Sequence, residues 1–353
     1  MSPNRNFWNG KKVFVTGHSG FKGAWLSFWL HSLGAKVIGV ALLPETEPNL
    51  FNMLELANTI ESAFVDIRDQ SLLADAVQAS GAEVVFHLAA QSLVRGGYKN
   101  PLATFETNFG GSNNLLEALR GNTSVRVAVI ITTDKVYRNL ENHVPFVETD
   151  ELGGRDPYSA SKAAVELLVE CYRESYLRNQ GVAVATARAG NVIGGGDWSP
   201  ERLLPDCMRA WASGQTVDIR MPDAVRPWQH VLDPLAGYLV LAQKLWDDPT
   251  LASSYNFGPD AEGSASVREA VLLAQANWGN AEARVAFGEA NAGPKEAEIL
   301  RLSNARAKAV LGYNPVWPLD AAMARTVGWH KDVASGIPAK LLCARDINAY
   351  ERG

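Results

Sequence analysis

The chain has 353 residues, of which 47% are hydrophobic and 20% charged, and its formal net charge is -5. This composition is typical of a globular protein with one large domain or two ordinary ones. The acidic balance, without a basic run, argues against nucleic acid or an anionic membrane as the main partner. The three cysteines form no Cys-x-x-Cys pair, which indicates neither a metal site nor disulfides. The first residues, MSPNRNFWNGKK, carry no secretory apolar stretch, so we expect a cytoplasmic protein.

Strand-like and helix-like segments alternate from residue 12 onward. Strand patterns occur at 12–17, 35–42, 62–69 and 83–90, and helical patterns occur at 24–34 and 71–80. Two longer helices are expected from Pro101 to Arg120 and from Tyr158 to Asn179, with buried strands at 125–133 and 182–190 on either side of the second. The alternation predicts an α/β fold of the Rossmann type, a doubly wound parallel sheet with roughly six core strands.

The pattern changes beyond residue 190 to short strands and helices with additional Pro and Trp. We therefore expect a Rossmann domain over residues 1–190. Residues 191–353 are expected to form a smaller mixed region that mainly binds the substrate and returns some strands to the core. Open parallel sheets bind their ligands at the carboxyl ends of the strands. The residues that follow each strand are therefore the first candidates for a site.

A glycine loop follows the first strand. The segment TGHSGFKGAW places Gly17, Gly20 and Gly23 three apart at the entrance of a helix, where free N–H groups and the helix dipole favour a pyrophosphate. The spacing differs from G-x-G-x-x-G, and Lys22 before Gly23 excludes a Walker A loop, but the strand-loop-helix setting predicts a dinucleotide site. With the adenine expected at residues 66 and 67, the predicted cofactor contacts are Gly17, Gly20, Phe21, Gly23, Asp66, Ile67, Leu88, Ala89 and Ala90.

Two features qualify this cofactor site. His87, within an apolar run, is more typical of a hydrogen-bonded core residue than of a catalyst. An acid usually follows the second strand and holds the adenosine ribose of NAD, yet here Leu43 stands where it is expected, with Glu45 and Glu47 a little later. No arginine lies there to bind a 2′-phosphate, so the sequence favours NAD over NADP.

The segment DPYSASK places Tyr158 and Lys162 on one face at the start of a helix. A phenol has an ordinary pKa near 10 and needs nearby positive charge to accept a proton at neutral pH. Together with the glycine loop, this pair resembles the extended short-chain dehydrogenase/reductase family. The resemblance implies bound NAD, with Tyr158 as the proton acceptor for the reacting hydroxyl. It also implies that Lys162 holds the nicotinamide ribose and lowers the tyrosine pKa. Thr133 would be the third catalytic residue, beside Tyr158 and Lys162.

Asp134 and Lys135 follow Thr133 directly, at the end of a buried strand. One interpretation is a solvated turn with a surface ion pair. The other is an acid and a base for dehydrating a sugar that is oxidised at carbon 4, by removal of the carbon 5 proton and loss of the carbon 6 hydroxyl. Adjacent strand residues point to opposite faces, so both can reach one sugar only if the chain leaves the extended form at about Thr133. We assign Lys135 as the base and Asp134 as the acid, and the sequence leaves their order open.

The Thr-Asp-Lys variant, GHSGFKGAWLSFWL, ARAGNVIGGGDW and RPWQHVLDPLAGYL resemble the sugar-nucleotide 4,6-dehydratases of this family, in particular those that act on CDP-glucose. Most thymidine-linked members carry Thr-Asp-Glu instead. The resemblance spans essentially the whole chain and implies a lyase with CDP-glucose as substrate, in deoxysugar biosynthesis of the O-antigen type. It further implies a homodimer built on the two long helices, and leaves a dimer of dimers open. The implied substrate contacts are Asn191, Arg202, Arg226 and His230, with Arg188 a weaker candidate; Trp198 and Trp228 either stack on the base or fill the core.

Three alternative functions stay open at this point. A sugar-nucleotide 4-epimerase would share the fold, the cofactor and the Tyr-Lys pair, but it has no use for the Asp-Lys couple. An inverting UDP-N-acetylglucosamine 4,6-dehydratase also carries Thr-Asp-Lys, yet it typically lacks a tyrosine at the position of Tyr158. The alternative outside the enzymes is a non-catalytic protein that senses NAD, against which the five retained polar groups argue.

Overall fold

A computed structural model describes residues 2–141, 144–260, 263–279, 283–288 and 297–353. Its centre is a seven-stranded sheet in the order β10-β6-β5-β4-β1-β2-β3, in which every neighbouring pair is parallel. The strands are β1 (Lys12–Thr16), β2 (Lys36–Ala41), β3 (Glu61–Phe64), β4 (Val84–His87), β5 (Val127–Ile131), β6 (Ala183–Ala189) and β10 (Ser254–Phe257). The predicted Rossmann-type sheet is therefore confirmed, with a seventh strand beyond the roughly six expected.

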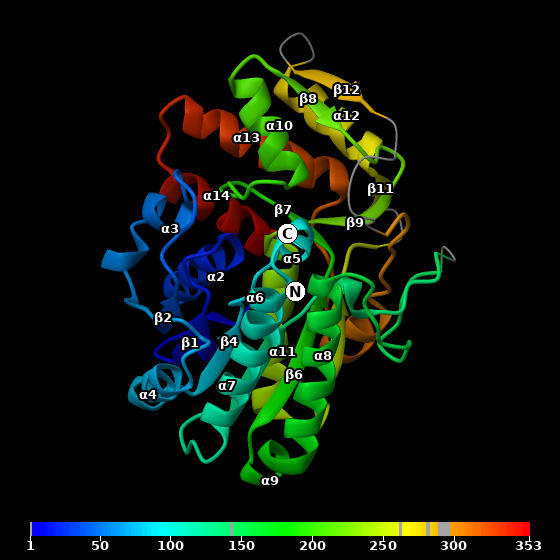
Figure 1. Cartoon of the computed structure of the whole chain (residues 1–353). Helices are drawn as coiled ribbons and strands as arrows, with labels where there is room; N and C mark the ends of the chain where they lie inside the picture. The colour runs from blue at the N-terminus through cyan, green and yellow to red at the C-terminus, as the bar shows by residue number, and fades with distance from the viewer. Residues whose placement is uncertain (1, 142–143, 261–262, 280–282, 289–296) are drawn as a thin grey trace.

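Helices cover both faces of this sheet because its inner strands are apolar on both faces (Figure 1). On one face, Val13 and Val15 pack with α2 (Phe21–Ser32), α11 (Leu232–Asp247) and α14 (Ala339–Arg352). On the other face, Phe14 and Ile130 pack with α4 (Gln70–Ser80), α7 (Gly111–Leu119) and α8 (Pro157–Tyr172). The site residues thus stand on strand ends that are held by two hydrophobic cores.

The two long helices occur where the sequence predicts them, and each contains a π-helical turn. The first runs through α6 (Pro101–Phe105), the π segment η2 (Glu106–Gly110) and α7. The second runs through α8, the π segment η4 (Arg173–Leu177) and α9 (Arg178–Gln180). None of the helices in the described part of the chain is both long and apolar enough to cross a bilayer.

The carboxyl-terminal region lies above the carboxyl ends of the strands in Figure 1 and has its own core of Ile193, Met208, Trp211 and their neighbours. Its elements are β7 (Asn191–Ile193), α10 (Leu203–Ala212), β8 (Thr216–Ile219), β9 (Val225–His230), β11 (Ser264–Ser266), α12 (Val267–Trp278), β12 (Arg284–Phe287) and α13 (Leu319–Ala334). The shorter elements of the chain are α1 (Arg5–Trp8), α3 (Leu50–Met53), η1 (Leu56–Asn58), α5 (Val94–Lys99), η3 (Asp134–Val136), η5 (Pro249–Leu251) and η7 (Ala307–Leu311).

Parts of this later sequence belong to the core of the sheet. Strand β10 pairs with β6, while α11 and α14 supply residues to the same hydrophobic cluster as α2. The division into a domain over 1–190 and a region over 191–353 stays a prediction. Because later segments return to the sheet, such a boundary would divide cofactor binding from substrate binding. It would not divide the chain into two parts that each have a complete core.

Candidate active site

The glycine loop leads from β1 into α2, and its shape depends on two of its glycines. Gly17 has a φ of 78°, and a Cβ there would lie 2.6 Å from the backbone nitrogen of Ala89. A Cβ on Gly23 would lie 2.0 Å from the carbonyl oxygen of Gly17. Gly20 caps α2, and no side chain forms a capping hydrogen bond with the amino end of the helix. These residues fit a pyrophosphate held by backbone N–H groups and the helix dipole.

The other predicted cofactor residues lie around this loop. Leu88 and Ala89 are tied to β1, since their backbone nitrogens donate to the carbonyl and hydroxyl oxygens of Thr16 at 3.1 and 3.2 Å. Asp66 forms a bidentate pair with Arg68, whose hydrogen bond holds the pKa of that carboxyl below its usual range. The Asp66 carboxylate is thus engaged by its neighbour, and its contact with adenine stays a prediction, as do those of Phe21, Ile67 and Ala90.

His87 matches its interpretation as a core residue. Its Nδ1 lies 2.7 Å from Oγ1 of Thr16 and its Nε2 lies 3.0 Å from Oγ of Ser112. Burial lowers the pKa of His87 to about 3, so the ring is neutral and both nitrogens are occupied.

The position after β2, where an acid usually holds the adenosine ribose, is occupied by an exposed leucine, Leu43, at 66% exposure. No acid stands at that position, as the sequence indicates.

The turn after β5 holds the Asp-Lys couple. The strand ends at Ile131, Thr133 is still extended, and a 3₁₀ turn begins at Asp134. Oγ1 of Thr133 donates to Oδ1 of Asp134 at 3.0 Å, and Nζ of Lys135 lies 3.0 Å from the same oxygen. The chain leaves the extended form where we expected, which lets adjacent residues share one contact.

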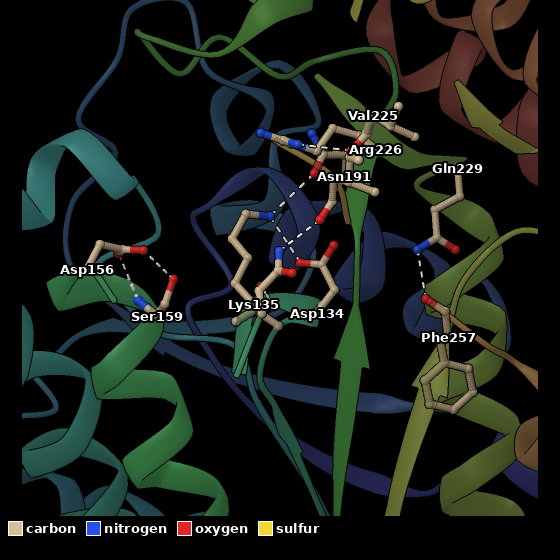
Figure 2. A network of polar contacts seen from close by, with 12 residues as sticks. Asp134, Lys135, Asp156, Ser159, Asn191, Val225, Arg226, Gln229 and Phe257 are labelled. Carbon is tan, nitrogen blue, oxygen red and sulfur yellow. Dashed lines mark hydrogen bonds and ion pairs between the residues drawn. The ribbon is translucent and has the colours of Figure 1, made fainter. Parts of the chain in front are cut away.

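This couple is not a solvated surface pair. The Asp134 side chain is fully buried, and that of Lys135 is 21% exposed. Oδ2 of Asp134 has no hydrogen-bond partner among the described residues. Figure 2 shows Lys135 reaching toward both Asp134 and Asn191, whose Oδ1 is 3.4 Å from Nζ. The interpretation as an exposed turn is therefore wrong, because surface pairs of that kind stay hydrated.

Tyr158 and Lys162 stand on the first turns of α8, which Asp156 caps by accepting from the backbone nitrogen of Ser159 (Figure 2). Burial raises the pKa of Tyr158 to about 12, and a hydrogen bond with Thr133 acts in the opposite direction. Burial lowers the pKa of Lys162 to about 8, and its Nζ donates to the Ile131 carbonyl at 3.0 Å. Because burial dominates both shifts, the expected lowering of the tyrosine pKa by Lys162 is not seen in this structure.

Two of the four predicted substrate residues lie beside this group. Asn191 begins β7 and contacts Lys135. Arg202 donates to Oδ2 of Asp197 at 3.0 Å and to Oγ of Ser92 at 2.9 Å, and its charge acts on Tyr158. Arg202 thus lies near the phenol, at the rim where the two regions of the chain meet.

The other arginines and His230 are buried more deeply. Nη1 of Arg226 donates to the carbonyl oxygens of Val225 and Glu298 at 2.9 and 3.3 Å. Arg188, the weaker candidate, is 3% exposed and forms an ion pair with Glu166 at 2.7 Å, so it is not available to a diphosphate. His230 lies in the hydrophobic core, with its ring centroid 4.6 Å from that of Trp317. The roles of Arg226 and His230 in substrate binding stay predictions.

Sequence reasoning missed two groups close to the couple. Lys22, which we used only to exclude a Walker A loop, has its Nζ 3.4 Å from the hydroxyl of Tyr238. Burial and the charges of Arg202 and Lys162 lower the pKa of Lys22 to about 7. Tyr238 comes from α11, which sequence order separates from the glycine loop. The position of Lys22 within the glycine loop could have identified it as a site residue from the sequence. No sequence pattern around Tyr238 indicates that it lies near the site.

The comparisons with known proteins agree with this arrangement. A family model described as GDP-mannose 4,6 dehydratase matches residues 14–326. The chain belongs to this family of extended short-chain dehydrogenases/reductases. A CDP-glucose 4,6-dehydratase from Salmonella typhimurium is 42% identical to it, over 98% of this chain and 98% of the relative. The predicted family is thereby confirmed.

Solved members of the wider fold are similar over almost the whole chain. A UDP-glucose-4-epimerase from Stenotrophomonas maltophila, solved with bound NAD, is 25% identical, with a TM-score of 0.79 over 93% of this chain and 100% of its own. A double mutant of a dTDP-glucose 4,6-dehydratase from Streptomyces venezuelae, also with NAD, is 25% identical, with a TM-score of 0.77 over 92% and 98%. Epimerases and dehydratases of this kind share one fold, so the fold alone does not separate the two activities.

Proposed function

We propose that this family member is a CDP-glucose 4,6-dehydratase, which converts CDP-glucose to CDP-4-dehydro-6-deoxyglucose and water with NAD as its cofactor. The observation that carries the proposal is the contact of the buried Asp134 with Lys135 at the end of β5, next to Tyr158. The 42% identity to a CDP-glucose 4,6-dehydratase over nearly the full length supports the choice of substrate.

Oxidation at carbon 4 uses the residues of α8. NAD, held by these residues, would supply a hydride acceptor for carbon 4 and a hydride donor for carbon 6. Tyr158 accepts the proton of the 4-hydroxyl, and Thr133, which hydrogen-bonds the phenol, holds that hydroxyl in line. Lys162 holds the nicotinamide ribose and supplies positive charge below the phenol. The proposed cofactor contacts lie in the glycine loop, at the strand ends and on α8: Gly17, Gly20, Phe21, Gly23, Asp66, Ile67, Leu88, Ala89, Ala90, Tyr158 and Lys162.

Dehydration uses the Asp134–Lys135 couple. The 4-keto group makes the carbon 5 proton acidic, Lys135 takes that proton, and Asp134 gives a proton to the carbon 6 hydroxyl as it leaves as water. A neutral amine and a protonated carboxyl are required at the start. Transfer of one proton from Lys135 to Asp134 across their 3.0 Å contact supplies both states at once. The proton on Lys135 then returns to carbon 5.

An epimerase is the second candidate, because one of the two solved structures that are 25% identical, the protein from Stenotrophomonas maltophila, is a UDP-glucose-4-epimerase. Epimerisation returns the hydride to carbon 4 and needs no acid or base at carbons 5 and 6, so the buried couple favours dehydration. Tyr158 argues against the inverting UDP-linked dehydratases. A non-catalytic protein that senses NAD is the remaining alternative, and turnover of any sugar nucleotide would exclude it.

The test is to offer the purified protein CDP-, dTDP-, GDP- and UDP-glucose separately with NAD. We expect only CDP-glucose to lose one water, as measured by mass spectrometry, and the product to carry deuterium at carbon 5 when the reaction runs in heavy water. Conversion to a 4-epimer of unchanged mass would identify an epimerase. No turnover with any of the four substrates would support the NAD-sensing alternative.

The finer expectations are part of the same proposal. Asn191, Arg202, Arg226 and His230 are the proposed contacts of the substrate. The enzyme acts in the cytoplasm, in biosynthesis of deoxysugars for lipopolysaccharide. It is a homodimer whose contact is formed by the two long helices, where Leu102, Phe105, Phe109, Leu167 and Tyr176 expose apolar surface.

A further inference from the structure

A buried ion pair lies directly beneath the proposed active site. Glu166 follows Lys162 by one turn on α8, and its Oε2 lies 2.7 Å from Nη2 of Arg188 on β6. Both side chains are almost fully buried, at 2% and 3% exposure. Burial favours a neutral carboxyl, but the Arg188 charge and hydrogen bonds outweigh it and hold the pKa of Glu166 below its usual range. The pair is therefore charged and rigidly enclosed.

The glutamate reaches one end of the catalytic turn. Thr132, the residue before Thr133, donates its hydroxyl proton to Oε1 of Glu166. Oε2 of Glu166 also accepts from Oγ1 of Thr186 at 2.7 Å and from Oγ of Ser254 at 3.2 Å. The same carboxylate thus joins α8 to the carboxyl side of β5, to the neighbouring strand β6 and to the edge strand β10 beyond it.

The arginine reaches the other end of the turn. Nη1 of Arg188 donates to the hydroxyl oxygen of Tyr137 at 2.8 Å, and Tyr137 is the residue directly after the turn Asp134–Val136. The Tyr137 hydroxyl in turn donates to Oδ1 of Asn256 at 2.6 Å, and its ring stacks on Phe146 with centroids 4.7 Å apart. Arginine suits this place because its planar fork binds two partners at fixed angles.

We propose that the Glu166–Arg188 pair is a positioning clamp, which holds the Asp134–Lys135 turn in register with Tyr158 and Lys162. The pair hydrogen-bonds Thr132 and Tyr137, which lie on either side of the Asp134–Lys135 couple. It thereby connects the turn to α8 one helical turn after Lys162. Neither Glu166 nor Arg188 touches the proposed reacting groups. Oxidation uses Thr133 at the start of this turn together with α8 and the glycine loop, whereas elimination requires both Asp134 and Lys135 to be placed against the same sugar, so loosening the clamp affects elimination more strongly.

Two variants test the clamp. Arg188→Lys retains a positive charge beside Glu166 but lacks the second guanidinium nitrogen that donates to the Tyr137 hydroxyl. Glu166→Gln/Arg188→Met removes both charges together and so leaves no unpaired buried ion. Glu83→Gln serves as the matched control, because Glu83 pairs with Lys11 at 3.0 Å at the amino ends of the strands.

The readout is the partition between the two half-reactions, which rests on the proposed dehydratase function. With CDP-glucose we expect both clamp variants to keep KM, but to slow elimination at least tenfold (roughly) relative to oxidation. A 4-keto sugar that retains its 6-hydroxyl should then appear by mass spectrometry. Glu83→Gln should keep the wild-type partition. An unchanged partition in both clamp variants, or the same change in Glu83→Gln, would overturn the proposal.

A second measurement does not depend on turnover. Hydrogen-deuterium exchange of the backbone amides of residues 132–138 should be faster in both clamp variants than in the wild type and in Glu83→Gln. Equal exchange in this segment would overturn the clamp even if the protein has another activity. Conversely, faster exchange in a protein that dehydrates no sugar nucleotide would retain the clamp and reject the proposed function.

Discussion

Tyr158 and Lys162 lie one helical turn apart, and burial shifts both toward the neutral form: the pKa of Tyr158 rises to about 12 and that of Lys162 falls to about 8. A neutral phenol is a proton donor, so its function as an acceptor requires extra positive charge in the bound complex. The same residue then holds the proton until the 4-keto product leaves. The proposed chemistry thus depends on a charge that only the complete complex has.

Tyr158→Phe tests this at a single atom. The variant lacks the hydroxyl and should lose oxidation at carbon 4 by roughly 10²- to 10⁴-fold, while CDP-glucose binding stays nearly intact because the ring still packs in place. Stopped-flow absorbance of the reduced nicotinamide measures the first effect, and calorimetry with CDP-glucose measures the second. Wild-type oxidation in the variant would mean that another group takes the proton.

Lys135→Met separates oxidation from dehydration. Thr133, Tyr158 and Lys162 remain, so the carbon 4 oxidation should proceed, while elimination slows by roughly 10²- to 10⁴-fold for loss of a general base. In heavy water, the trapped 4-keto sugar should contain little deuterium at carbon 5, in contrast to the wild-type product. Asp134→Asn is the companion variant: if it loses the carbon 5 exchange and Lys135→Met keeps it, the two roles are reversed.

At the scale of elements, the sequence predicts those features that a local pattern determines. The glycine loop, the buried strands up to β6 and the long helices all have uninterrupted apolar or 3.6-residue patterns, and the structure has them. Strand β10 lies in the region that was expected to return some strands to the core, but its four residues do not reveal that their partner is β6, about 70 positions earlier in the chain. Long-range pairing is not encoded in a short window.

Side-chain direction was the other unpredictable property. Arg188 lies near the end of β6 and Asn191 begins β7 only three residues later, yet one turns into a buried pair and the other toward Lys135. The alternation of a strand determines such directions only when its register and the bend after it are known. Glu166 was missed for a similar reason: a glutamate on a helix is ordinarily exposed, and its burial depends on Arg188 from another element.

The helical surface with Leu102, Phe105 and Phe109 gives a prediction at this scale. These side chains are 70%, 39% and 39% exposed and recur on one side of the first long helix. Phe109→Glu places a charge in the expected dimer contact and should convert the dimer to a monomer, as measured by sedimentation velocity. Leu272→Glu, at an exposed leucine on α12, is the control and should leave the oligomeric state unchanged. A monomeric wild type would refute the dimer directly.

At the scale of the whole molecule, buried titratable groups predict the response to acid. Burial lowers the pKa of His87 and His230 to about 3 and that of His330 to about 4, so the unfolded chain binds three more protons there below pH 6. Burial raises the pKa of Asp233 to about 6, so the folded chain binds one more proton in the same range. The net difference of two protons means that stability falls as the pH falls.

These four groups should together make the free energy of unfolding decrease by about 3 kcal/mol per pH unit between about pH 4.5 and 5.5, measured by urea denaturation at several pH values. Asp233→Asn removes the opposing group among these four and should steepen their joint contribution to the slope by about half. His330→Gln should flatten it by about half, whatever its effect on stability at neutral pH. A slope that neither variant changes would contradict the assignment of these groups.

The return of late segments to the sheet has a consequence for biosynthesis. Nε1 of Trp29 on α2 donates to Glu351 at 2.8 Å, and α11 and α14 cover the same face of the strands as α2. A nascent chain that has emerged only to residue 190 has all the strands from β1 to β6, but on that face it has α2 without α11 and α14. Completion of the core therefore waits until almost the whole chain has left the ribosome, and a premature stop before α14 yields a product with exposed tryptophans, a target for chaperones and proteases.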